Sequence, residues 1–265
     1  MNDLSTPYPL TPEQIERYAK DGYIKLKDVL SEEMLSEYGD AIFSAVQALS
    51  TQDKPLEQRS TYGKAFLQVS NLWERDAKVK ALAFSERLGR IAAELMRVDG
   101  VRMYHDQALF KEAGGGYTPW HADQFYWPLG TDNTVTAWIP LQAVPAEMGP
   151  LSFCVGSQTI LEGRDLAISD ESEEKINTSL KNYPKDETPY DLGEVSFHSG
   201  WVFHRAGPNT ADRVRGVMTV IYFEDGSRLM EPKTDAHRSD WERWLPGAEI
   251  GEVIDTPRNP VIYRA

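Results

Sequence analysis

The sequence has 265 residues, of which 41% are hydrophobic, enough apolar material for one sizeable core in a single domain spanning 1–265. Its 28 Lys and Arg against 41 Asp and Glu give a formal net charge of -13, so we expect neither nucleic-acid nor membrane partners. The N-terminus, Met1 to Pro7, lacks a basic start and an apolar segment, and the single cysteine, Cys154, reads as a small core residue; we expect a cytoplasmic protein.

Helical signals dominate residues 1–100, which we interpret as a mainly helical flank. Thr11-Pro-Glu-Gln14 combines a capping hydroxyl, a proline at the first helical position and a glutamine at the third, so it predicts a helix, which we expect to stop at Gly22. Similar patterns predict a strand at 23–27, a helix that begins at Ser31 and another helix near 85–96.

From Val101 onward the pattern changes to short β-rich runs separated by Gly, Pro, Asn and Asp. The runs are 101–110, 135–144, 151–155, 201–203 and 214–223. They predict a mainly β fold with flanking helices, in which residues 101–225 form a jelly-roll core.

Two segments lie outside this pattern. Residues 160–192 are polar, with an acidic run at 169–174, and predict a surface loop or helix that is also a candidate lid. In 226–265, Trp241 and Trp244 lie about one helical turn apart, so we expect this C-terminal segment to pack against the barrel.

His121 and Asp123 form a His-x-Asp triplet, and on a strand residues i and i+2 point to the same side. His204 ends a later apolar run before a turn. Two imidazoles and one carboxylate on one face are typical of non-haem iron(II) oxygenases. A lone His-x-Asp, however, is more often a surface hydrogen-bonding pair, and His198 competes with His204 as the third ligand, although we interpret His198 as a supporting or packing residue.

An arginine on the next predicted strand could serve this site. Arg215 lies in an apolar run, where a buried guanidinium needs an anion such as a carboxylate. Its alternative role is a structural salt bridge. Arg213 shares its face by strand alternation, so spacing alone leaves both candidates open.

The motifs together resemble the phytanoyl-CoA dioxygenase-like iron(II)/2-oxoglutarate oxygenases. They occur in that family's order over roughly 11–224: Trp120-His-Ala-Asp-Gln-Phe-Tyr-Trp-Pro128, Thr136-Ala-Trp-Ile-Pro-Leu141, Gly149-Pro-Leu151 with Gly156-Ser157, and His204-x-x-Gly-Pro-Asn209 with Arg215.

The resemblance implies a double-stranded β-helix with His121, Asp123 and His204 as metal ligands and catalytic residues. It favours Arg215 over Arg213 as the clamp for 2-oxoglutarate, and it places Gln107, Thr136 and Trp138 near that cosubstrate, although barrel packing alone would account for the last two. The implied cofactors are Fe(II), 2-oxoglutarate and O2, and the implied reaction is oxidation of a small organic metabolite with release of succinate and carbon dioxide. Halogenating relatives lack the carboxylate, so Asp123 favours hydroxylation or a related oxidation.

Two other functions fit parts of the pattern. A zinc hydrolase also uses two histidines and a carboxylate, but it leaves Arg215 unexplained. A jelly-roll module that binds without catalysis would keep the fold but has no need of an intact ligand set. We expect a small-molecule substrate in contact with at least one of Phe125, Tyr126 and Trp127, and no feature of the sequence specifies an oligomeric state.

Overall fold

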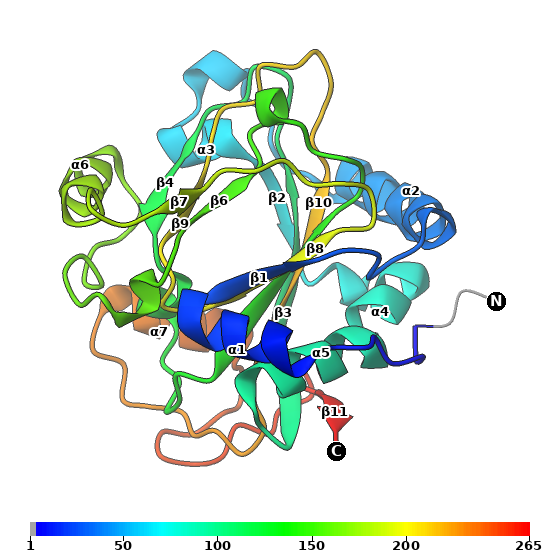
Figure 1. Ribbon diagram of the computed structural model, residues 1–265, viewed down its shortest axis with the longest axis vertical. Coiled ribbons are helices and arrows are strands. Elements are labelled where there is room, and N and C mark those ends of the chain that lie inside the picture. Colours follow the sequence, from blue (N-terminus) through cyan, green and yellow to red (C-terminus); the bar gives the residue numbers. More distant parts are fainter. Residues whose placement is uncertain (1–3) are drawn as a thin grey trace.

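The computed structural model describes residues 4–265 and arranges them around two antiparallel β-sheets (Figure 1). The larger sheet has seven strands in the order β1-β8-β5-β10-β3-β11, with β2 also paired to β3. They are β1 (Tyr23–Leu26), β2 (Leu67–Ser70), β3 (Gly100–Phe110), β5 (Thr134–Pro140), β8 (Val195–Ser199), β10 (Val217–Glu224) and β11 (Val261–Arg264). The smaller sheet, ordered β4-β9-β6-β7, contains β4 (Thr118–His121), β6 (Leu151–Cys154), β7 (Lys185–Asp186) and β9 (His204–Ala206). This is the expected double-stranded β-helix.

The α-helices are α1 (Pro12–Asp21), α2 (Glu32–Leu49), α3 (Thr61–Ala65), α4 (Ala77–Ala83), α5 (Glu86–Met96), α6 (Asp170–Ser179) and α7 (Asp235–Trp244). Helices α1, α2 and α5 pack against the larger sheet, whereas α6 lies on the other side of the barrel beside β4 of the smaller sheet (Figure 1). Short 3-10 helices connect other elements: η1 (Leu56–Gln58), η2 (Leu72–Glu74), η3 (Asp123–Tyr126), η4 (Ala146–Met148) and η5 (Ser157–Thr159). The largest hydrophobic cluster joins α2 and α5, through side chains such as Ile42 and Ile91, to Val135 and Phe197 of the sheet.

The predicted helix starts are confirmed. Thr11 accepts from the backbone of Gln14, whose side chain bonds back in a capping box, and Gly22 ends α1 at φ 82. Ser31 and Ser85 cap α2 and α5 by accepting from the backbone N–H groups of Met34 and Leu88. These boundaries depend on hydrogen bonds within one turn, which is why the local sequence identifies them.

The predicted strand at 201–203 is wrong. Residues 201 and 202 form a turn, and β9 begins only at His204. Val202 and Phe203 are fully buried without belonging to a strand, so their apolar character reflects burial rather than strand pairing. The predicted runs also omitted β4 and β8, two short strands whose histidines, serines and proline obscure the β pattern.

The acidic run at 169–174 forms the start of α6, which Ser169 caps and which packs beside β4. Strands β1, β2 and β11 lie in the larger sheet, although they fall outside the range 101–225 in which the sequence placed the jelly-roll core. The single-domain division remains a prediction.

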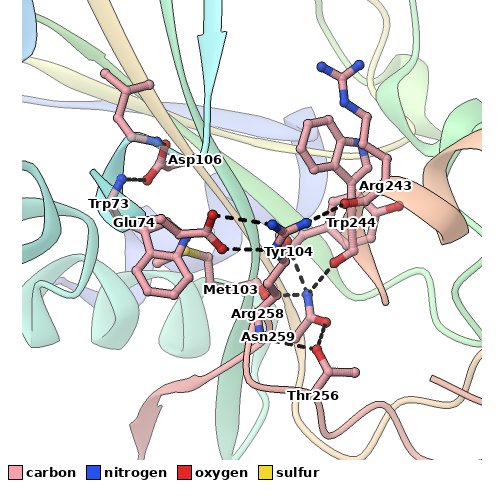
Figure 2. Close-up of polar contacts among 11 residues, drawn as sticks. Trp73, Glu74, Met103, Tyr104, Asp106, Arg243, Trp244, Thr256, Arg258 and Asn259 are labelled. Carbon is pink, nitrogen blue, oxygen red and sulfur yellow. Dashed lines mark hydrogen bonds and ion pairs between the residues drawn. The ribbon is translucent and has the colours of Figure 1, made fainter. Parts of the chain in front are cut away.

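The C-terminal segment fixes α7 against β3 through a buried amide. The Asn259 side chain is fully buried, and its Nδ2 donates to the carbonyls of Met103, Tyr104 and Trp244 at 3.1, 3.1 and 3.2 Å (Figure 2). Nearby, Arg258 pairs with Glu74. These bonds hold the end of α7 beside β3.

Among the described residues, no helix combines the length and apolar character needed to cross a membrane. Residues 1–3 of the N-terminal segment considered above lie outside the described part of the chain.

Candidate active site

A cavity of about 380 Å³ lies between the two sheets, with side chains from both sheets in its wall. The larger sheet contributes His105 and Gln107 of β3, Thr136 and Trp138 of β5, His198 of β8, and Thr219 and Ile221 of β10; the smaller contributes His121 of β4, Leu151 of β6, and His204 and Ala206 of β9. Almost all of the residues singled out in the sequence therefore meet in one place.

His121, Asp123 and His204 form a group that could hold a metal ion. Their ligand atoms all lie within 4.8 Å of one another. Strands β4 and β9 pair His121 directly with His204. Asp123 opens η3 rather than continuing the strand, but the extended backbone at Ala122 (φ -119, ψ 127) keeps the alternation that puts the carboxylate beside the imidazole.

Local hydrogen bonds fix which nitrogen each imidazole presents. His121 Nδ1 donates to the carbonyl of Pro119 at 2.7 Å, and His204 Nδ1 donates to that of Val202 at 3.1 Å. The Nε2 atoms, with their lone pairs free, then face Asp123 Oδ1 at 3.6 and 3.7 Å. Burial lowers the pKa of both imidazoles to about 4, so at neutral pH they are uncharged, as metal ligands must be.

The two oxygens of Asp123 have different surroundings. Oδ1 faces the triad, whereas Oδ2 accepts from the Thr136 hydroxyl at 3.3 Å and lies 3.4 Å from His198 Nε2. Burial opposes ionisation of Asp123, but the surrounding histidines, His204 foremost, outweigh it and hold the carboxyl pKa below its usual value. His198 is buried beside the triad and lies outside the metal-ligand group.

Arg215 lies fully buried in the same cavity. Its Nη1 donates to the carbonyl of Gly149, while its Nε has no hydrogen-bond partner. The guanidinium lies 5.4 Å from the Trp138 ring and 5.6 Å from the Phe66 ring, and it pairs with no carboxylate in the described part of the chain. Burial lowers its pKa to about 9, still well above neutrality, so a buried cation faces the cavity without a counter-charge.

A second buried basic residue, Lys111, lies beside it. Lys111 forms a backbone bridge with Arg215, and its Nζ donates to the carbonyls of Gly116 and Gly207 at 2.6 and 2.7 Å. Burial, together with the charge of Arg215, lowers the Lys111 pKa to about 6. Arg213, by contrast, is exposed, so tertiary placement separates the two arginines that spacing could not.

The residues fit the iron(II) and 2-oxoglutarate that the family resemblance implies. Two imidazole nitrogens and one carboxylate oxygen on one side of a cavity suit iron(II), and an unpaired buried guanidinium in the same cavity suits a dicarboxylate cosubstrate. Gln107, Thr136 and Trp138 also line the cavity.

The remaining aromatic and histidine side chains near the site are placed as follows. Tyr126 and Trp127 line the cavity, as does His105, whose Nδ1 bonds to the backbone carbonyl of Asp106. His237 lies away from the metal group and bonds to the carbonyl of Phe125. The sequence reasoning missed Asp240, Arg243 and Trp244 of α7 as cavity residues; the tryptophan spacing indicated packing but not contact with a ligand space.

Comparison with known proteins agrees with this geometry. The family model described as phytanoyl-CoA dioxygenase matches residues 18–217, which is most of the chain. The chain belongs to the phytanoyl-CoA dioxygenase family. With its His-Asp-His triad, it is an iron- and 2-oxoglutarate-dependent oxygenase. No curated protein matches its sequence.

Solved structures share the family fold. The α-ketoglutarate-dependent carbocyclase SnoK from nogalamycin biosynthesis is 24% identical, with a TM-score of 0.77 over 98% of this chain and 100% of SnoK. The epimerase SnoN, in complex with Fe3+, α-ketoglutarate and nogalamycin RO, is 24% identical, with a TM-score of 0.76 over 95% of this chain and 98% of SnoN. EctD from S. alaskensis, with 2-oxoglutarate and 5-hydroxyectoine, is 18% identical, with a TM-score of 0.72 over 95% of this chain and 87% of EctD.

Proposed function

We propose that this oxygenase hydroxylates a small organic metabolite, with His121, Asp123 and His204 as its iron ligands and Arg215 as the clamp for 2-oxoglutarate. The observation that carries the proposal is that a buried, unpaired guanidinium and a buried His-Asp-His group share one cavity. A volume of about 380 Å³ suits a small cosubstrate and substrate together.

The protein's own residues have separate tasks in this reaction. His121 and His204 present neutral Nε2 atoms, and Asp123 presents Oδ1 while Thr136 holds Oδ2. Arg215 binds and orients the distal carboxylate of 2-oxoglutarate, and Trp138 and Phe66 exclude water from that contact. When iron(II), 2-oxoglutarate and dioxygen are bound, they supply the oxidising chemistry, with succinate and carbon dioxide as products.

Hydroxylation is the specific reaction that we favour. The complete ligand set, with Asp123 in place, leaves no protein-ligand position for a halide. Proteins of the same fold include a carbocyclase and an epimerase, so analysis of the product is needed to identify the reaction type. Mass spectrometry should show the gain of one oxygen atom in the product; loss of hydrogen without oxygen gain would contradict hydroxylation.

Anaerobic titration of iron(II) and 2-oxoglutarate into the metal-free protein tests the site directly. We expect a visible metal-to-ligand charge-transfer band, abolished in His204→Ala and weakened at equal cosubstrate concentration in Arg215→Ala, because the first loses a metal ligand and the second the carboxylate clamp. Arg213→Ala, which removes an exposed arginine two residues away, is the matched control and should titrate like the wild type. A folded wild-type protein that develops no band would overturn the proposal.

A further inference from the structure

One wall of the cavity has no task in holding iron or 2-oxoglutarate. Helix α7 and the 3-10 helix η3 build it together with strand β3, and η3 and α7 pack against each other. Its residues are His105, Tyr126, Trp127, Asp240, Arg243 and Trp244.

Asp240 is the unusual member of this wall. Its Oδ2 accepts from the Tyr104 hydroxyl at 3.1 Å, yet no Lys, Arg or His of residues 4–265 forms an ion pair with it. Burial raises the pKa of this carboxyl to about 7, against the opposing effects of Tyr104, Arg243 and Trp244. Because no ion pair holds this group, a cation that binds beside it would favour its ionised form.

Arg243, one helical turn along α7, does not supply that cation. Its guanidinium lies 4.4 Å from the Trp244 ring centroid, and Figure 2 shows it beside the indole. Arg243 is exposed, so solvent screens its charge, whereas the Asp240 carboxylate lies in the cavity wall. The negative group of the wall therefore remains available to a ligand.

The aromatic neighbours of Asp240 add to the attraction for a cation. Tyr126, Trp127 and Trp244 all border the cavity, and His105 stacks on Trp244 at 4.1 Å between centroids. Aromatic faces attract ammonium groups, most strongly when water is excluded. Asn259 holds the end of α7 against β3 (Figure 2). The Tyr104 hydroxyl donates to the Asp240 carboxylate, so the wall is preorganised.

We propose that this wall is a substrate subsite for a positively charged nitrogen group, with Asp240 as its specificity-determining residue. The inference rests on the proposed function, because it requires an organic substrate in the same cavity as iron. The substrate would then be an amine-bearing metabolite whose ammonium group contacts Asp240 while the carbon to be oxidised lies toward the triad. The cavity would then offer a basic side chain, Arg215, to the cosubstrate and an acidic one, Asp240, to the substrate.

Three simple probes of similar size test the charge preference. Calorimetric titration of the anaerobic protein, loaded with iron(II) and 2-oxoglutarate, compares phenethylammonium, phenethyl alcohol and 3-phenylpropionate. We expect the ammonium to bind about tenfold more tightly than the alcohol, and the carboxylate more weakly than either. Equal affinities, a preference for the carboxylate, or no binding of the ammonium would overturn the subsite.

Variants of one helix assign the preference to a residue. Asp240→Asn keeps the size and the acceptor for Tyr104 but removes the charge, so the preference for ammonium should disappear, whereas Asp240→Glu should retain it. Glu242→Gln makes the same change of charge on the exposed part of α7 and should bind like the wild type. A preference that persists in Asp240→Asn would also overturn the assignment.

The charge-transfer band separates this inference from the proposed function. A band in the wild type and in Asp240→Asn, without any ammonium preference, would remove the subsite and leave the oxygenase site intact. If no band forms in the wild type, the proposed function fails, and the same probes titrated into the metal-free protein still decide whether Asp240 selects a cation.

Discussion

At the scale of single residues, the two histidines of the triad are oriented by the same kind of local hydrogen bond. In each, Nδ1 donates to the backbone carbonyl two residues earlier, Pro119 for His121 and Val202 for His204. Asp123 depends instead on residues far from it in sequence, since Thr136 and His198 border its Oδ2. The imidazoles are thus positioned by their own chain segment and the carboxylate by the neighbouring sheet.

Thr136→Val should therefore weaken iron binding while keeping the shape of the side chain. Without the hydroxyl, Oδ2 loses a donor and the carboxylate loses orientation, and we expect iron(II) affinity to fall about 10–100-fold. Competition with a chelator measures this affinity. Thr219→Val is the control, because Thr219 lines the same cavity but its hydroxyl bonds to the Gln107 carbonyl. Equal losses in both variants would contradict a specific role for Thr136.

At the scale of elements, α7 shows how a peripheral helix becomes part of a site. One buried side-chain amide, that of Asn259, joins the last residue of α7, Trp244, to strand β3 (Figure 2). The helix packs on η3, the element that carries Asp123 and Tyr126. Displacement of α7 would therefore open the substrate side of the cavity while leaving the triad strands paired.

Removal of this amide should loosen α7 more than the rest of the fold. Asn259→Ala leaves three buried carbonyls without their shared donor, so we expect a loss of about 2–4 kcal/mol in unfolding free energy. Hydrogen exchange should accelerate first in 234–245. Arg258→Ala removes a partly exposed ion pair to Glu74 and one bond to the Arg243 carbonyl, and it should cost under about 1 kcal/mol. A similar cost in both variants would show that the amide does not hold the helix.

At the scale of the whole molecule, the N-terminal strand β1 connects the two sheets. Tyr23 of β1 stacks on Phe153 of β6 with centroids 4.1 Å apart, and its hydroxyl donates to Asp186 of β7 at 2.9 Å. Lys25 reaches the same carboxylate at 3.6 Å. The first hundred residues of the chain thus contribute to the closure of the barrel as well as to its helical cover.

Buried histidines should make the stability of the metal-free protein sensitive to acid. Burial lowers the pKa of His105 from 6.5 to about 4. The unfolded chain takes up a proton first, so the contribution of the neutral imidazole is complete above pH 6.5 and is lost progressively as the pH falls toward 4.

His105→Phe keeps a ring against Trp244 and removes the titration. Between the two pKa values, its unfolding free energy should fall less steeply with acid than that of the wild type, by up to about 1.4 kcal/mol per pH unit. Denaturant unfolding at a series of pH values measures both slopes. Parallel curves would mean that His105 does not remain neutral in the folded protein.

Much of the fold and of the triad could be predicted from sequence because the signals are local or form an ordered motif set. Thr11, Ser31 and Ser85 mark helix starts through bonds within one turn. The His-x-Asp triplet needs only extended backbone at Ala122. Family membership follows from motifs spread through 18–217.

Three features were decided only by the tertiary structure. Strand alternation gave Arg213 and Arg215 the same face, and only the folded chain buries Arg215 and exposes Arg213. The apolar run before His204 is buried in a turn, because burial does not require strand pairing. Asp240 reaches the cavity because distant residues of β3 and the C-terminal segment hold α7 there. Sequence patterns reflect interactions between residues that are close in sequence. These three outcomes depend instead on which segments, distant in sequence, pack together.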